Sequence, residues 1–243
     1  MRNFFQATKA LYGPTKSGLA PLKSEDGSIL YKDEASIQAR WKEHFKKLLN
    51  RESTVSETTI SQLPMYPPKN DLAEPPLPQE VEKAVQQLRN NKASGPDSIP
   101  AEVYKFGGPD LTARVHSLLL RIWEDETLPD DLKNAVITII YKTGDRSDCG
   151  NYRGIALLST AGKILARALL NRLLPLSEGI LPETQCGFRP SRGTVDMIFT
   201  AKQIQEKCTE QRQPLFMAFI DLTKAFDSLN REALWKILKR FGW

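Results

Sequence analysis

Apolar residues recur at helical spacing along much of the chain, so the pattern predicts more helices than strands. The predicted helices cover residues 37–49, 79–88, Ala101–Phe106, 111–126, 160–174, 193–210 and 230–241, with a shorter one through Phe4, Thr8 and Leu11. Two apolar runs predict buried strands, one at Ala135–Tyr141 and one at residues 215–222, and the second run is expected to be covered on both faces. The fold class expected from this pattern is α+β.

Breaker residues divide the chain into three segments. Residues 1–50 carry helical patterns, whereas residues 51–79 hold six of the 16 prolines behind a Ser/Thr-rich stretch. That composition is typical of an extended, semi-rigid linker. Residues 80–243 then form the main segment, and no internal repeat is visible.

The composition is that of a globular protein with a mild basic bias. Hydrophobic residues make up 40% of the 243 residues and charged residues 26%, and the formal net charge is +5. Between Lys142 and Arg192 there are eight Lys/Arg and four Asp/Glu, so most of the excess lies in this stretch. The bias fits a polyanionic partner but is too weak to establish one.

Several protein classes are excluded at this point. Cys149, Cys186 and Cys208 lack CxxC spacing, which argues against a disulfide framework or a zinc site and favours an intracellular location, cytoplasmic or nuclear. The N-terminus is too polar for a signal peptide, and the run AVITII is too short to span a membrane. The sequence contains no GxGxxG, GxxxxGK[ST], GxSxG or HExxH motif.

The segment AFIDLTKAFDSLNR, residues 218–231, is the most informative for chemistry. Asp221 ends an apolar run, which would place a carboxylate at a sheet edge beside solvent. A carboxylate oxygen there can bind Mg²⁺, and the next carbonyl, that of Leu222, can assist. A turn aspartate that merely ends a strand is the simpler alternative.

The whole string FxDLxKAFD resembles motif A of reverse transcriptases, in the version found in LINE-type, non-LTR retrotransposons. Three upstream segments resemble further motifs of that family in the correct order: NKASGPDSIPAEVYKFGG, LKNAVITIIYKTGDRSDCGNYRGIALLSTAGKILARALLNRL and LPETQCGFRPSRGTVDMI. Residues 20–49 resemble the region just before the polymerase. The resemblance implies mostly helical fingers followed by part of a right-hand polymerase palm.

The resemblance also implies roles for individual residues. Asp221 matches the catalytic, metal-binding carboxylate, and Leu222 and Phe226 match nucleotide-side positions, with Phe226 as the ring that excludes a ribose 2′-hydroxyl. Lys142 and Arg153 match the cations that meet the triphosphate. The template-side motif matches Gln185, Phe188 and Arg189, which suit phosphate contact and base stacking. The implied partners are an RNA template, a DNA primer and deoxynucleoside triphosphates.

One departure limits the activity expected. These polymerases need a second carboxylate pair in a (Tyr/Phe)-x-Asp-Asp turn after motif A, and the only Asp-Asp pair here, Asp130-Asp131, precedes motif A and resembles a helix N-cap. Since a two-metal site needs carboxylates from more than one element, Mg²⁺ catalysis is expected only in a complete enzyme. The alternatives are a non-catalytic nucleic-acid-binding module and a non-functional relic. An incomplete palm would also leave residues 215–222 unpaired and exposed, and so favour self-association.

Overall fold

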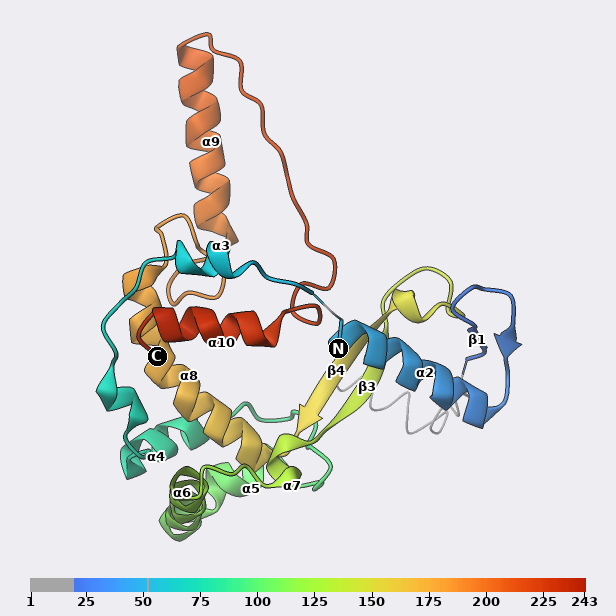
Figure 1. The fold of residues 1–243 in the computed structure, drawn as a ribbon, viewed down its shortest axis with the longest axis vertical. Coiled ribbons are helices and arrows are strands. Elements are labelled where there is room, and N and C mark those ends of the chain that lie inside the picture. The colour runs from blue at the N-terminus through green and yellow to red at the C-terminus, as the bar shows by residue number, and fades with distance from the viewer. Residues whose placement is uncertain (1–19, 52) are drawn as a thin grey trace, which may run out of the picture. The chain divides into compact units, whose positions relative to one another are not determined.

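The computed structural model describes residues 20–51 and 53–243 (Figure 1). Helices outnumber strands, and the strands form two two-stranded sheets, so the expected α+β class is confirmed. The chain divides into two compact units, one of residues 1–53 with 137–156 and one of residues 54–136 with 157–243. The short helix predicted through Phe4, Thr8 and Leu11 lies outside the described residues.

The first unit is built around a small hairpin and one helix. Strands β1 (Leu22–Lys23) and β2 (Leu30–Tyr31) pair antiparallel, with Leu22 opposite Tyr31. Helix α2 (Glu34–Leu49) begins at the N-cap Asp33, whose carboxylate accepts a hydrogen bond from the Ser36 amide at 2.8 Å. Leu22, Ile37 and Cys149 form the core of this unit, and Trp41 packs against it. The rest of the stripe predicted over residues 37–49 is half-buried.

Strands β3 (Ala135–Tyr141) and β4 (Tyr152–Leu158) form the second sheet. The predicted strand at Ala135–Tyr141 is confirmed, but the expectation that it is buried is wrong, since nearly all of its residues are exposed. Pairing in a two-stranded ladder satisfies only the edges of a strand, whereas burial of its faces requires another layer packed on the sheet. Strand β4, which no apolar pattern predicted, lies between the short helix η2 (Cys149–Asn151) and helix α8 (Thr160–Ile180).

The core of the second unit is a packed group of helices. It consists of α4 (Pro78–Gln86), α5 (Ala101–Phe106), α6 (Gly108–Glu124) and α8 (Thr160–Ile180). Their inward faces bury Val81, Ala84, Val85, Val115, Leu119, Ile164 and Ala168. These helices were all predicted, because each carries an apolar stripe at helical spacing.

The breaker-rich segment between α4 and α5 packs against the beginning of α8. A Cβ atom at Gly95 would lie 2.4 Å from the carbonyl oxygen of Leu158, so this close approach requires glycine. Thr160 donates a hydrogen bond to the Ile99 carbonyl at 2.8 Å, and Ser159 caps α8 by accepting from the Gly162 amide. This loop therefore has a defined position on the fold.

Three further features of the helical structure differ from the sequence pattern. Helix α8 continues through Pro175 to Ile180 instead of ending at residue 174. Asp130 and Asp131 lie in the first turn of α7 (Asp130–Lys133), whose N-cap is Pro129, so the interpretation of the pair as an N-cap is wrong. Residues 51–79 contain α3 (Glu57–Ser61) and the short helix η1 (Asn70–Ala73).

The C-terminal helices agree with the prediction. Helix α9 (Thr194–Glu210) contains no buried residue, and α10 (Arg231–Arg240) buries Ala233. The proline-rich segment contacts α10, since Arg240 donates hydrogen bonds to the Leu63 and Ser61 carbonyls. Gly242 follows at a φ of +84°, where a Cβ atom would lie 2.4 Å from the Pro67 carbonyl oxygen.

Residues 215–222 are not a strand, so this prediction is wrong. Within the described residues, this segment runs between α9 and a turn at residues 223–228 without joining either sheet. A strand is defined by its hydrogen-bonded neighbour, and in the part of the chain that the structure describes no strand pairs with this segment. The expectation that this segment is exposed is confirmed, because the side chains of Phe216, Phe219, Ile220 and Leu222 are open to solvent.

Candidate nucleic-acid and nucleotide site

The loop of residues 181–193 carries the three residues expected on the template side. It connects α8 to α9 and presents the Phe188 ring to solvent, with 88% of the residue exposed. Phe188 and Ser191 have φ values of 61° and 58°, a left-handed conformation that non-glycine residues adopt rarely. The loop therefore holds an unusual backbone shape to display an apolar ring.

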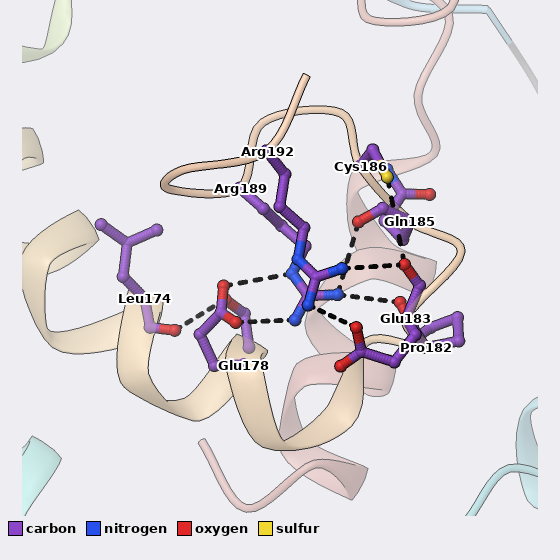
Figure 2. A network of polar contacts seen from close by, with 9 residues as sticks. Leu174, Glu178, Pro182, Glu183, Gln185, Cys186, Arg189 and Arg192 are labelled. Atoms are coloured by element: carbon purple, nitrogen blue, oxygen red, sulfur yellow. Dashed lines mark hydrogen bonds and ion pairs between the residues drawn. The ribbon is translucent and has the colours of Figure 1, made fainter. Parts of the chain in front are cut away.

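Arg189 points inward, away from solvent, and is bound by Glu178 (Figure 2). Its Nε and Nη2 atoms donate to the Glu178 carboxylate at 3.2 and 2.6 Å, and Nη1 donates to the Pro182 carbonyl at 2.8 Å. The hydrogen bond from Arg189 holds the pKa of Glu178 below its usual range, and the same contact raises the pKa of Arg189. The pair thus stays charged at neutral pH.

Gln185 contributes mainly its backbone to this network. Its amide donates to the Pro182 carbonyl at 3.0 Å and its carbonyl accepts from Arg189 at 3.4 Å, while its side chain donates to the Gly187 carbonyl. Arg192 binds the Glu183 carboxylate and carbonyl on the solvent side of the same loop. The structure therefore brings Gln185 and Arg189 together within a local network.

Phe188 also contacts Phe226, which belongs to the segment that resembles motif A. Its ring centroid lies 5.5 Å from that of Phe226, with the ring planes at 84°. Phe226 belongs to the turn at residues 223–228, in which the Asp227 and Ser228 amides donate to the Lys224 carbonyl. Both rings are largely exposed, so the edge-to-face pair forms an aromatic surface open to solvent.

Asp221 and Leu222 lie just before this turn, and both are exposed. In residues 20–51 and 53–243, no group of three or more His, Cys, Asp or Glu side chains is arranged to hold a metal ion. Asp221 could supply one oxygen ligand, and the Leu222 carbonyl a second. The described residues therefore do not fit a complete two-metal centre.

Lys142 and Arg153 belong to the first unit. The Lys142 amide donates to the Asn151 carbonyl at 2.9 Å, so Lys142 follows β3 directly beside the beginning of β4, which contains Arg153. Both residues are exposed. The β3–β4 pair therefore brings the two predicted triphosphate-side cations to neighbouring strands.

The second unit contains a basic pocket that the sequence analysis did not predict. Its volume is about 310 Å³, and its lining includes Arg89, Lys92, Lys163 and Arg167 around an apolar floor that contains Leu158 and Leu170. The sequence held one sign of it, because Lys163 and Arg167 are four residues apart and so share a face of α8. The contributions of Arg89 and Lys92 depend on the packing of α4 against α8.

Part of the chain matches a known protein family. Residues 140–243 match the family described as reverse transcriptase (RNA-dependent DNA polymerase). Phe188, Asp221 and Phe226 all lie in the matched segment. Together with the relatives described next, this match confirms the resemblance to the reverse transcriptases of LINE-type, non-LTR retrotransposons.

Three relatives illustrate the similarity. The chain is 26% identical over 99% of its length to the transposon TX1 uncharacterized 149 kDa protein of Xenopus laevis. It is 30% identical over 67% of its length to the RNA-directed DNA polymerase from mobile element jockey of Drosophila melanogaster. It is also 31% identical over 43% of its length to the Pol polyprotein of retrotransposable element R2 of Popillia japonica. The chain spans 19%, 18% and 14% of these relatives, respectively.

Proposed function

We propose that this chain contributes the first part of a reverse transcriptase domain to an RNA-directed DNA polymerase. In this role residues 80–243 act as fingers and first palm segment, residues 1–50 precede the polymerase, and residues 51–79 link the two. The complete enzyme adds deoxynucleotides to a DNA primer on an RNA template, inside the cell and in the cytoplasm or nucleus. The observation that carries the proposal is the contact between Phe188 and Phe226, since it joins the template-side motif to motif A.

Each residue of the site has a separate task in this proposal. Phe188 stacks on unpaired template bases, while Gln185 and Arg189 shape the loop that carries it. Phe226 occupies the space that a ribose 2′-hydroxyl requires, and its contact with Phe188 limits the positions its ring can take. The charges of Lys142 and Arg153 bind the triphosphate.

Asp221 would supply one ligand to a magnesium ion, and the Leu222 carbonyl would supply a second. When bound, Mg²⁺ neutralises charge on the transferring phosphoryl group. The remaining carboxylates must come from other residues, because the described part of the chain shows no metal-binding group. The 243 residues alone are therefore expected to bind nucleic acid without extending a primer.

A non-catalytic nucleic-acid-binding module is the second candidate. The basic pocket favours it, since four cations around an apolar floor suit the phosphates and bases of a single strand without any metal. Primer extension by a longer polypeptide distinguishes the two candidates.

The binding surface common to both candidates is tested by the salt dependence of RNA binding. The chain is expected to bind a single-stranded RNA oligonucleotide, with affinity that falls as salt rises. Cations that bind a triphosphate also bind RNA phosphates when no nucleotide is present, and each lost phosphate contact should reduce the log–log salt slope by about 0.7. Lys142→Gln with Arg153→Gln should therefore reduce the slope by about 1.4. Lys207→Gln with Lys239→Gln, on α9 and α10, is the charge-matched control. An equal change in both double variants would contradict the assignment of Lys142 and Arg153.

A further inference from the structure

The connection between α8 and α9 is held by two ion pairs of opposite character. Arg189 and Glu178 form the inner pair, in which only 3% of the arginine side chain is exposed. Arg192 and Glu183 form the outer pair, whose glutamate is 80% exposed. The inner pair spans 11 residues and so ties the loop back onto the last turn of α8.

The geometry of the inner pair suits a structural clasp. The Arg189 fork lies against both carboxylate oxygens of Glu178, and its other terminal nitrogen bridges the Pro182 and Gln185 carbonyls (Figure 2). A guanidinium that is bound on one edge by a carboxylate and on the other by backbone fixes the backbone's course. Phe188, the residue just before Arg189, is turned outward by its positive φ.

In this arrangement Phe188 is available for base stacking, whereas Arg189 is not available for phosphate contact. A buried guanidinium bound to a carboxylate has little charge to offer an RNA phosphate, whereas the exposed Phe188 ring has a free face. Because the ring is held in position before RNA binds, stacking requires a smaller loss of conformational entropy. The clasp therefore acts on binding through the position of Phe188.

We propose that Glu178 is a positioning residue, which with Arg189 clasps the loop of residues 181–193 so that Phe188 is presented, against Phe226, to an unpaired RNA base. Arg189 itself makes no phosphate contact. The inference rests on the proposed nucleic-acid-binding function, and it gives a role to Glu178, which no motif identified.

The charge of Glu178 makes the proposal testable. Removing a carboxylate near an RNA surface favours binding by simple electrostatics. If the clasp positions Phe188, Glu178→Gln instead weakens binding of a single-stranded RNA oligonucleotide by the full chain, by roughly threefold to tenfold. Glu210→Gln, which removes the carboxylate of an exposed pair with Lys207, is the matched control and should bind as tightly as the unaltered chain or more tightly.

Two further variants separate positioning from direct contact. In the Phe188→Ala background, Glu178→Gln should cause no further loss, because the ring it positions is gone. Arg189→Gln should weaken binding without changing the salt slope, whereas loss of a phosphate contact would reduce that slope by about 0.7. Amide hydrogen exchange of the full chain should accelerate across residues 182–193 in Glu178→Gln and stay unchanged in Glu210→Gln.

Each outcome decides the proposal. Unchanged or tighter RNA binding by Glu178→Gln, an equal loss in the Phe188→Ala background, or a reduced slope in Arg189→Gln would overturn it. If the unaltered chain binds no RNA, the proposed function fails along with the role of the clasp in binding. Exchange still reports on the clasp in that case, and unaltered exchange in Glu178→Gln would refute the clasp itself.

Discussion

Arg172 illustrates how one side chain can organise a helical unit. From α8 it donates to both carboxylate oxygens of Glu80, at 2.7 and 2.6 Å, and to the carbonyls of Leu72, Glu74 and Pro75. It therefore connects the proline-rich segment to the beginning of α4, and it explains why that segment has a defined position here.

We expect Arg172→Met to destabilise the chain by about 1–3 kcal/mol. The substitution keeps the apolar stem but leaves Glu80 and several carbonyls without their donor. Water screens part of the loss, since 27% of the Glu80 side chain is exposed. Urea unfolding followed by circular dichroism measures the change. Lys207→Met, in the exposed pair with Glu210, is the control and should cost less than about 0.5 kcal/mol; equal losses would contradict the role of Arg172.

The same pair predicts a dependence of stability on pH. The hydrogen bond from Arg172 lowers the pKa of Glu80 below its ordinary value of 4.5. At pH values between the lowered pKa and 4.5, Glu80 is protonated in the unfolded chain but ionised in the folded chain. The stability that the Glu80–Arg172 pair contributes is therefore complete above pH 4.5 and is lost as pH falls through the lowered pKa. The stability difference between the unaltered chain and Glu80→Gln should therefore shrink on acidification. A difference that grows below pH 4.5 would contradict this assignment.

Residue types in the site could be predicted from the sequence, but their surroundings could not. The motifs identified Phe188, Arg189 and Asp221 as chemically important, and the exposed ring of Phe188 suits its expected role. The burial of Arg189 depends on Glu178, which lies 11 residues away and belongs to no motif. The Arg189 side chain therefore points inward because of a contact with Glu178 that forms only in the folded loop.

At the scale of elements, the packing of α4, α6 and α8 carries the second unit. Leu119 of α6 is fully buried, whereas its neighbour Leu118 is 40% exposed. Leu119→Ala should cost about 2–5 kcal/mol, because it leaves a cavity among tightly packed side chains. Leu118→Ala should cost less than about 1 kcal/mol. Urea unfolding of both variants is the measurement, and similar losses would show that this helical core is packed differently.

Helices were predictable here because their apolar stripes depend on local sequence. Strands were less so, because a strand needs a partner that the local sequence does not reveal. Ala135–Tyr141 found one in β4, but residues 215–222, which are just as apolar, did not. The basic pocket was hidden for a similar reason, since its cations come from separate elements.

At the scale of the whole molecule, the exposed apolar segment predicts self-association. Phe216, Phe219 and Ile220 are 91%, 89% and 85% exposed, and such a run is an association hazard. We expect reversible association that is weakened by Phe216→Ser with Phe219→Ser, because these changes remove apolar area without altering charge. Sedimentation velocity over a range of concentrations measures it. Phe106→Ser, an exposed phenylalanine on α5, is the control, and an equal effect would locate the association elsewhere.

The central claim is that Asp221 is the metal-binding carboxylate of a reverse transcriptase. The direct measurement is primer extension on an RNA template by a polypeptide in which these 243 residues are followed by the remaining polymerase sequence of a relative. The account predicts Mg²⁺-dependent incorporation of deoxynucleotides that Asp221→Asn abolishes. Asp131→Asn, in the first turn of α7, should leave incorporation intact. Extension that survives Asp221→Asn, or that Asp131→Asn abolishes equally, would contradict the claim.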